Sequence, residues 1–276
     1  MLLEDFFRES NVADFFSESW GRKPLLLPAP KLNVSNPEGL LERLLNLRRL
    51  RYPQVRVLNG GGALNPLLYT ASTRYGFNED IIGEKVSSLA VAPNTIKIED
   101  LESLDEEFGE WGKALREVFN SKITLNGYFS FGPSEGIPVH YDPHHIFAVQ
   151  LFGAKDWMLG KEQAEQYPHQ AFTMEGGEVI PPSIPIKLGE GQMLYLPPGR
   201  MHSVRTNDVS VHVAIGVHTP RCFQGVSSLL EKATALHPEL RSEMPFVVSQ
   251  SGLQFKDLRR EELEAIFEIV KSGLNE

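Results

Sequence analysis

Residues 121–160 read "SKITLNGYFSFGPSEGIPVHYDPHHIFAVQLFGAKDWMLG", and this stretch decides the fold class. Short runs rich in β-branched and aromatic residues, such as "ITLNGYFSF", "HIFAVQLFG" and "KDWMLG", are separated by Gly and Pro. Runs of this length, broken by turn residues, are typical of an antiparallel sandwich or barrel. The runs "IPIKLGEGQMLYLP", "HSVRT" and "SVHVAIGVH" extend the pattern. The sequence therefore predicts a mainly β core over about residues 121–220.

The same stretch packs ligand-type side chains closely together, in "HYDPHH": His140, Asp142, His144 and His145. Because residues two apart on a strand point to the same side, His140 and Asp142 can converge on one point. A third ligand must come from a remote strand, and "LYLPPGRMHSV" at 194–204 offers His202 just beyond a Pro-Pro-Gly turn. Two imidazoles and one carboxylate on one face form the facial triad of non-haem Fe(II) oxygenases.

Other interpretations of these histidines stay open, because a bare H-x-D pattern is common by chance. A lone histidine in a β core is more often a hydrogen-bonded core residue than a ligand. A zinc site could use His140, His144 and an Asp, although it lacks the fixed-spacing partners of structural zinc sites. If the triad is correct, His144 and His145 are not ligands. One of them can then face the substrate, since both follow a proline that starts a new strand.

The composition argues against several classes of protein. A formal net charge of −9 does not suit a broad nucleic-acid interface, which needs a clustered basic face. The apolar runs are far shorter than the roughly 20 residues of a membrane-spanning helix, and acids interrupt the N-terminal "MLLEDFFRESN", unlike a secretory signal. Cys222 is the only cysteine, so a disulfide within the chain is excluded. We expect a cytoplasmic protein whose acidic surface favours solubility and could attract a basic partner.

The chain divides into three zones by pattern. Residues 1–120 mix short helical segments with short strands, and residues 121–220 carry the β core. From residue 223 onward the periodicity turns helical, most clearly in "KDLRREELEAIFEIVKSGL" at 256–274. Its apolar stripe consists of Leu263, Ile266, Phe267, Val270 and Leu274. We expect residues 221–276 to form helices whose stripe packs either on the core or against a second copy, as a homodimer.

With these motifs in place, the sequence resembles the JmjC-type cupin family, in the branch that contains the ribosomal-protein hydroxylases. The resemblance covers about residues 12–220 and rests on "ADFFSESWGRKPLLLP", "NGYFSFGPSEGIPVHYDPHHIFAVQLFGAKDWMLG" and "GEGQMLYLPPGRMHSV". It implies a double-stranded β-helix core of the jelly-roll type within a catalytic domain of residues 1–220. It also implies Fe(II) as the metal, held by His140, Asp142 and His202.

The resemblance carries further residues of the site. Family members have a Lys or Arg fifteen positions after the first ligand histidine, here Lys155, and its implied role is to bind the distal carboxylate of 2-oxoglutarate. A cation in an apolar pocket needs an anion, but Lys155 could also be an exposed hairpin lysine after Gly153. Members also place an Asn and a Tyr on a pocket-facing strand, matched by Asn126 and Tyr128. His212 can line the pocket too, although we expect a buried, hydrogen-bonded histidine there.

The activity implied by the resemblance is a 2-oxoglutarate-dependent hydroxylation that consumes O2, with an amino-acid side chain of a protein or peptide as the first expectation for the substrate. Ribosomal-protein hydroxylases add a helical dimerisation region and a winged-helix domain, and residues 221–276 have room for a few helices but not for both. The ribosomal substrate is therefore in doubt. Two alternatives stay open: a hydroxylase of a free amino acid or natural product, and a non-catalytic metal-binding scaffold or sensor. Lys155 argues against a scaffold, which needs no anion-binding lysine.

Overall fold

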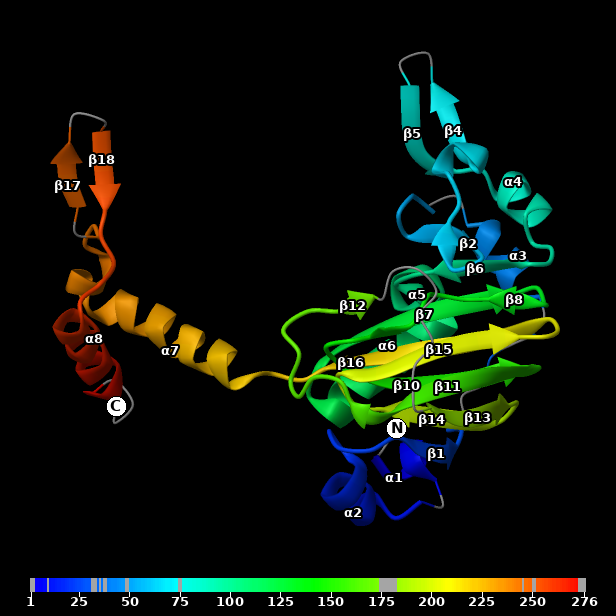
Figure 1. The fold of residues 1–276 in the computed structure, drawn as a ribbon, viewed down its shortest axis with the longest axis horizontal. Coiled ribbons are helices and arrows are strands. Elements are labelled where there is room, and N and C mark those ends of the chain that lie inside the picture. Colours follow the sequence, from blue (N-terminus) through cyan, green and yellow to red (C-terminus); the bar gives the residue numbers. More distant parts are fainter. Residues whose placement is uncertain are drawn as a thin grey trace. The chain divides into compact units, whose positions relative to one another are not determined.

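The computed structural model describes the chain except for residues 1–2, 9, 31–33, 35, 37–38, 48–49, 74–75, 174–182, 245, 250–251 and 273–276. The chain divides into two compact units, Met1–Thr219 and Pro220–Glu276. The first unit contains two large antiparallel sheets and one hairpin with flanking helices, and the second contains helices and one hairpin (Figure 1).

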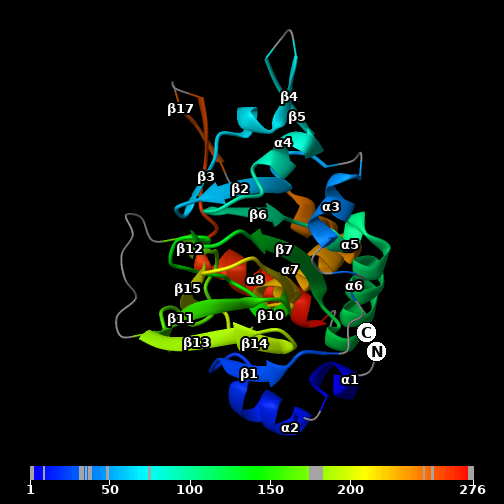
Figure 2. The same ribbon diagram turned by 90° about the vertical axis from the view of Figure 1, so that its right-hand side faces the viewer.

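The larger sheet of the first unit has eight strands within the described residues, and Figure 2 labels all of them except β16, which is labelled in Figure 1. In spatial order they are β1 (Leu25–Pro28), β14 (Gln192–Leu196), β10 (His145–Phe152), β16 (Ser210–His218), β7 (Lys122–Ser130), β6 (Asn94–Ile98), β2 (Val55–Asn59) and β3 (Gly62–Ala63). The predicted core runs "ITLNGYFSF", "HIFAVQLFG" and "SVHVAIGVH" thus lie side by side as β7, β10 and β16. Strands from the first hundred residues extend the sheet at both edges, beyond the predicted 121–220.

The smaller sheet packs against one face of the larger one. Its path runs through β12 (Phe172–Thr173), β9 (His140–Tyr141), β15 (Arg200–Thr206), β11 (Ala154–Gln163) and β13 (Ser183–Gly189), and β8 (Ser134–Glu135) pairs with β15. An apolar cluster fills the space between the sheets: Ile146, Ala148, Trp157, Leu159, Leu188, Leu194 and Leu196. The prediction of a mainly β core with flanking helices is confirmed.

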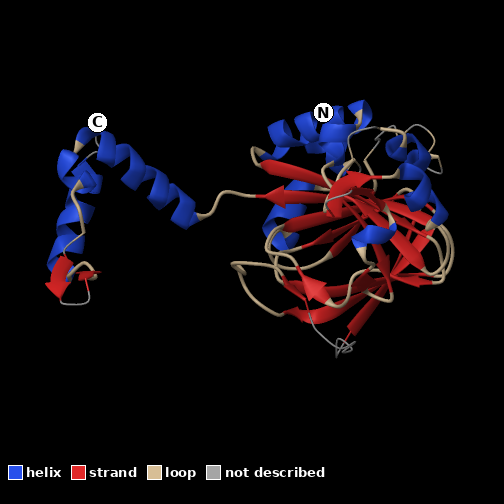
Figure 3. Cartoon of the chain, turned by 90° about the horizontal axis from the view of Figure 1, so that it is seen from above, coloured by secondary structure: helices blue, strands red, loops and turns tan. Residues whose placement is uncertain are grey.

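Strand β10 shows why its sequence is almost continuously apolar. Ile146 and Ala148 face the smaller sheet, whereas Phe147 and Val149 face the opposite side of the larger sheet, and all four are buried. A strand that is covered on both faces has no polar side, so the alternation of apolar and polar residues disappears. The helical layer that covers the second face is seen from above in Figure 3.

Short N-terminal helices and one long helix form this covering layer. They are α1 (Leu3–Phe7), α2 (Val12–Asp14) with the π-helical turn Phe15–Ser19, α3 (Leu40–Leu45), α4 (Gly83–Ser88), α5 (Leu101–Leu104) and α6 (Glu106–Phe119). Helix α6 begins where the Asp105 side chain accepts from the N–H groups of Glu107 and Phe108, and it ends at Asn120 in the left-handed region. Its Phe108 and Trp111 join the same core as Phe147. A 3-10 turn (Pro66–Leu68) and the hairpin of β4 (Thr70–Thr73) and β5 (Gly76–Ile81) complete the unit.

The second unit is only partly helical, which corrects the prediction for residues after 223. Between α7 (Cys222–Leu236), the 3-10 turn Pro238–Arg241 and α8 (Arg260–Ser272) it contains a hairpin of β17 (Phe246–Ser249) and β18 (Gly252–Phe255). The run "FVVS" is β-branched and too short for a helical period, which favours a strand. Leu274 of the predicted stripe lies outside the described residues. Of the helices that the structure describes, none is long and apolar enough to cross a membrane.

Candidate functional site

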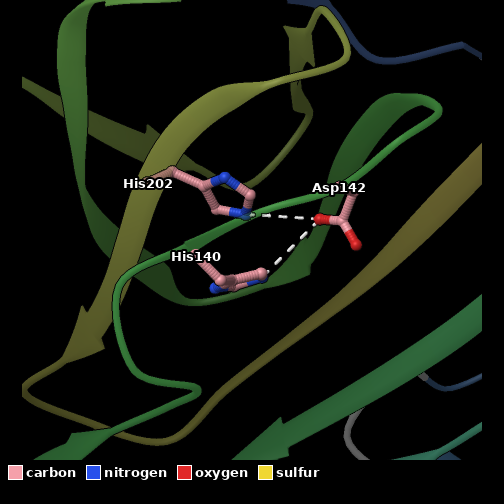
Figure 4. Close-up of side chains that lie close together, drawn as sticks. All are labelled: His140, Asp142 and His202. Carbon is pink, nitrogen blue, oxygen red and sulfur yellow. Dashed lines mark ion pairs between the residues drawn. The ribbon is translucent and has the colours of Figure 1, made fainter. Parts of the chain in front are cut away.

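The three predicted ligands come together at one point of the smaller sheet. His140 on β9 and His202 on β15 are register partners, and Asp142 directly follows β9. The Oδ2 atom of Asp142 lies 3.6 Å from His140 Nε2 and 3.9 Å from His202 Nε2, and Figure 4 shows these pairs as dashed lines. All three ligand atoms lie within 4.8 Å of one another. Two imidazole nitrogens and a carboxylate oxygen can therefore reach a single ion.

Hydrogen bonds to backbone carbonyls fix the orientation of both imidazoles. His140 Nδ1 lies 2.7 Å from the Pro138 carbonyl, and His202 Nδ1 lies 3.0 Å from the Arg200 carbonyl. Because a carbonyl only accepts, each Nδ1 carries the proton, and the Nε2 lone pair is left free to bind a metal. Burial, with His140 as the next cause, lowers the pKa of His202 to about 4, so this imidazole stays neutral.

The charge of Asp142 completes a donor set that suits a divalent cation. Burial acts to raise its pKa, but the neighbouring His140 and His202 outweigh burial, and the pKa lies below the ordinary value. The carboxylate is therefore ionised and lies beside both imidazoles. Two nitrogens and one oxygen fit Fe(II), which binds this facial arrangement and keeps further positions open. Among the described residues, this group is the one cluster with metal-ligand geometry, and His144 is not part of it.

The Pro-Pro-Gly turn between β14 and β15 holds two of the ligands in place. Its Gly199 has a φ of +76°, a conformation that side chains with a Cβ rarely adopt. The Gly199 N–H donates to the Asp142 carbonyl at 2.9 Å, and its carbonyl accepts from the Ala164 N–H at 3.0 Å. The strand that leaves this turn carries His202. The turn thus ties the position of Asp142 to that of His202.

We expect Gly199→Ala to lower both stability and metal affinity. The new Cβ would lie 1.9 Å from the Glu165 carbonyl oxygen, so the turn and Asp142 must shift. Gly191→Ala is the matched control, because Gly191 has a similar φ of +74° but nothing within 4 Å of its Cβ position. The control should lose about 1–2 kcal/mol of unfolding free energy from backbone strain alone. Gly199→Ala should lose more and bind metal about 10-fold more weakly, measured by calorimetry. Equal losses in the two variants would remove the positioning role of the turn.

A cavity of about 340 Å³ adjoins the triad. Alternate residues of β7 and β16 line it, while the residues between them face the apolar core. From β7 these are Asn126, Tyr128 and Ser130, and from β16 they are His212, Ala214 and Gly216. Asn126 and Tyr128 therefore share the cavity face, as predicted. Asn126 also accepts from the Asp100 N–H at 3.4 Å.

Lys155 is buried at the same cavity, so the alternative of an exposed hairpin lysine is wrong. Its side chain reaches Ser130 Oγ at 2.7 Å and the Tyr128 carbonyl at 3.5 Å, and the residue is 3% exposed. Thr95 Oγ1 donates to the same Ser130 at 3.0 Å. Within the described part of the chain, no carboxylate pairs with Lys155, and burial lowers its pKa to about 7. A buried cation with only uncharged partners fits a carboxylate ligand such as the distal end of 2-oxoglutarate.

The remaining histidines have different surroundings. His144 lines the cavity and stacks on His218, with ring centroids 4.1 Å apart. His145 points elsewhere: it stacks on Trp20 at 3.7 Å and its Nδ1 lies 2.9 Å from the Tyr195 hydroxyl. His144 is thus the member of the pair that faces the site, whereas His145 holds the N-terminal segment against the sheet.

The expectation of a hydrogen-bonded core histidine at position 212 is wrong in one respect. His212 is 4% exposed and lines the cavity, but its buried Nδ1 has no hydrogen-bond partner among the described residues. The ring packs flat on Tyr128 instead, with centroids 4.6 Å apart and an interplanar angle of 0°. Burial, then Lys155, lowers its pKa well below the ordinary value, so His212 is a neutral wall of the site.

Several cavity residues escaped the sequence analysis. Ser130 could have been found, because it continues the two-residue spacing of Asn126 and Tyr128. Thr95 and Lys97 of β6 could not, since only the pairing of β6 with β7 brings them to the cavity.

The chain is similar in sequence to known proteins. Residues 107–224 match the family model described as JmjC domain. A bifunctional lysine-specific demethylase and histidyl-hydroxylase NO66 from Aedes aegypti is 26% identical over 87% of this chain and 39% of its own length. Ribosomal oxygenase 2 from Bos taurus is 25% identical over 79% of this chain and 47% of its own length. The chain thus spans less than half the length of these relatives.

Solved structures show the same fold. E. coli ycfD superposes with a TM-score of 0.61 at 18% identity, over 97% of this chain and 68% of that one. The ribosomal oxygenase YcfD in complex with cobalt and 2-oxoglutarate superposes with a TM-score of 0.59 at 17% identity, over the same shares of the two chains. The expected double-stranded β-helix of the JmjC type is therefore confirmed, and residues 107–224 are similar in sequence to the JmjC domain, as most of the chain is similar to the ribosomal oxygenases.

Proposed function

We propose that the chain is an Fe(II)- and 2-oxoglutarate-dependent dioxygenase that hydroxylates an amino-acid side chain of a protein or peptide. His140, Asp142 and His202 hold the metal in this proposal. The observation that carries it is the buried, carboxylate-free Lys155 on the same cavity as a two-histidine, one-carboxylate cluster. A protein that only binds a metal needs no buried lysine, and a protein that only binds an anion needs no metal ligands. The two features together therefore favour an enzyme that uses both a metal and an anionic cosubstrate.

Fe(II) held by His140, Asp142 and His202, together with 2-oxoglutarate, would supply the oxidation: one atom of O2 would enter a C–H bond of the substrate to give C–OH, and the other would enter succinate as carbon dioxide is released. The residues of the chain bind and orient. Lys155, Ser130 and the face formed by Asn126 and Tyr128 receive the cosubstrate. The Nδ1 protons of the two ligand histidines are held by carbonyls, so no ring rotation is needed on metal binding. Buried Trp157, stacked 5.7 Å from His202, keeps water from one side of the cluster.

A protein substrate is supported by the relatives, whose names are ribosomal oxygenase and histidyl-hydroxylase. The net charge of −9 would favour a basic partner protein over nucleic acid. We assign catalysis to residues 1–220 and a dimer-forming role to residues 221–276. Exposed apolar side chains support the second role: Phe223, Val226, Leu263 and Phe267.

The first test is anaerobic binding of Fe(II) and 2-oxoglutarate, followed by the visible charge-transfer band of the chelate. We expect the band in the wild-type protein and not in His202→Ala. If the wild-type protein shows no band, the cosubstrate assignment fails and a metal-binding scaffold becomes the leading function.

The second test asks which class of substrate is oxidised. Mixtures of ribosomal proteins, histones or free amino acids are supplied with O2, and succinate release and the gain of one oxygen atom are followed by mass spectrometry. We expect turnover with a protein mixture. Turnover with free amino acids alone would favour the small-molecule hydroxylase instead.

A further inference from the structure

Four strands of the larger sheet place four side chains in one row across the cavity wall. Arg56 on β2 is the register partner of Lys97 on β6, Lys97 is the partner of Tyr128 on β7, and Tyr128 is the partner of His212 on β16. All four line the cavity. The row therefore runs from the buried neighbourhood of Lys155 to the half-buried guanidinium of Arg56.

The outer half of this row, formed by Lys97 and Arg56, carries more positive than negative charge. Lys97 Nζ lies 2.6 Å from Glu99 Oε1, and Arg56 pairs with the same oxygen, so two cations share one carboxylate. Their side chains are 12% and 35% exposed. Lys97 keeps its proton: burial acts to lower its pKa, but Tyr128 and Glu99 outweigh burial and raise it. Two charged groups with one counter-charge leave a net positive charge on this wall.

The other charged side chains of the cavity have their own partners. Asp142 belongs to the proposed metal cluster, and Lys155 with its hydroxyl neighbours receives the cosubstrate carboxylate. Arg205 pairs with Glu135 at 2.9 Å. Among the described lining residues, four are lysines or arginines, and Asp142 is the only acid. A lysine or arginine side chain entering this cavity would meet like charge and no available carboxylate.

Lys97 is also held in a fixed position. Its Nζ lies 5.5 Å from the centroid of the Tyr128 ring, and that ring is stacked on His212. Thr95 stands two residues before Lys97 on the same face of β6, about 7 Å along the strand. Thr95 donates a hydrogen bond to Ser130, and Ser130 accepts one from Lys155. The cavity wall thus has two positively charged sites, an inner one at Lys155 and an outer one at Lys97 and Arg56. The inner site suffices to bind the cosubstrate.

We propose that Lys97 and Arg56 bind a carboxylate of the substrate, so that the enzyme prefers a peptide with an acidic side chain next to the residue that it oxidises and rejects lysine or arginine there. The inference rests on the proposed function and specifies its substrate class. The acidic surface as a whole can still attract a basic protein, because this preference concerns only the segment inside the cavity. A carboxylate could instead belong to the cosubstrate, and the experiment separates the two sources.

The experiment uses labelled, capped peptides that are identical except for one Asp, Asn or Lys. Binding to the full chain, loaded with Mn(II) and 2-oxoglutarate without O2, is measured by fluorescence anisotropy. For the wild-type protein we expect the Asp peptide to bind about 10-fold more tightly than the Asn peptide, and the Lys peptide to bind least. Lys97→Gln should abolish this order, and Lys97→Glu should reverse it. The exposed Lys187→Gln is the matched control and should keep it.

Two measurements keep the outcomes distinct. The double variant Lys97→Gln with Glu99→Gln keeps a hydrogen-bonding pair at these positions but removes both charges. Its thermal unfolding temperature shows whether a loss of preference for the Asp peptide is caused by unfolding of the protein. The affinity of each variant for 2-oxoglutarate should match the wild type within about twofold.

A wild-type protein that binds 2-oxoglutarate but ranks the peptides equally overturns the inference and leaves the proposed function intact. Weakened 2-oxoglutarate binding in Lys97→Gln assigns the row to the cosubstrate and also overturns it. A wild-type protein without 2-oxoglutarate binding refutes the proposed function, and the inference falls with it.

Discussion

Asp142→Ala is expected to abolish metal binding and hydroxylation. The carboxylate supplies the one negative charge of the cluster and lies 3.6 and 3.9 Å from the two imidazoles, so its loss leaves two neutral nitrogens for a divalent cation. Since loss of an outer-shell partner already weakens metal affinity roughly 10- to 100-fold, loss of this ligand should exceed 100-fold. Metal content after dialysis and calorimetric titration with Fe(II) under nitrogen measure the effect.

His144→Ala provides the control for Asp142→Ala. It removes a neighbouring imidazole that lines the same cavity but lies outside the cluster. We expect its metal affinity to stay within about twofold of the wild type. If His144→Ala lost metal and His202→Ala kept it, the zinc alternative with His144 as a ligand would replace the triad.

The parts of this molecule that could be predicted from the sequence depend on neighbours along the chain. His140 and Asp142 are two residues apart, and the Pro-Pro-Gly turn indicates where the strand that carries His202 begins. The strands around them could be recognised because burial on both faces makes a run such as "HIFAVQLF" apolar throughout. Local rules therefore suffice for the β core and for the pair His140 and Asp142, whereas the choice of His202 as the third ligand also rested on the family resemblance.

The rest depends on strand pairing, which the sequence does not show. Thr95 is in contact with Ser130 only because β6 lies beside β7, and the shared use of Glu99 by Arg56 and Lys97 needs β2 next to β6. The role of Lys155 could be predicted from the sequence only in part. Its position was expected from the family resemblance, but its burial and uncharged partners are properties of the folded cavity.

Lys155→Ala is expected to raise the 2-oxoglutarate concentration needed for half-saturation about 100-fold while changing metal affinity about twofold at most. Lys155 is 3% exposed and its ammonium group bonds only to Ser130 and a carbonyl, so no other described cation can replace it beside Ser130. Calorimetric titration of the Mn(II)-loaded protein measures the first effect, and metal content measures the second. Equal loss of both would refute the cosubstrate role of Lys155.

The pH dependence of cosubstrate binding gives this role a sharper test. Burial places the pKa of Lys155 at about 7 in the free protein. The lysine is charged below that pH and neutral above it, so 2-oxoglutarate affinity should be highest at low pH and fall about 10-fold per pH unit above 7. An arginine stays protonated throughout this range, so Lys155→Arg should bind 2-oxoglutarate with little change between pH 7 and 9. A wild-type affinity that does not fall with rising pH, or a fall of equal steepness in Lys155→Arg, would show that another group controls the binding of the anion.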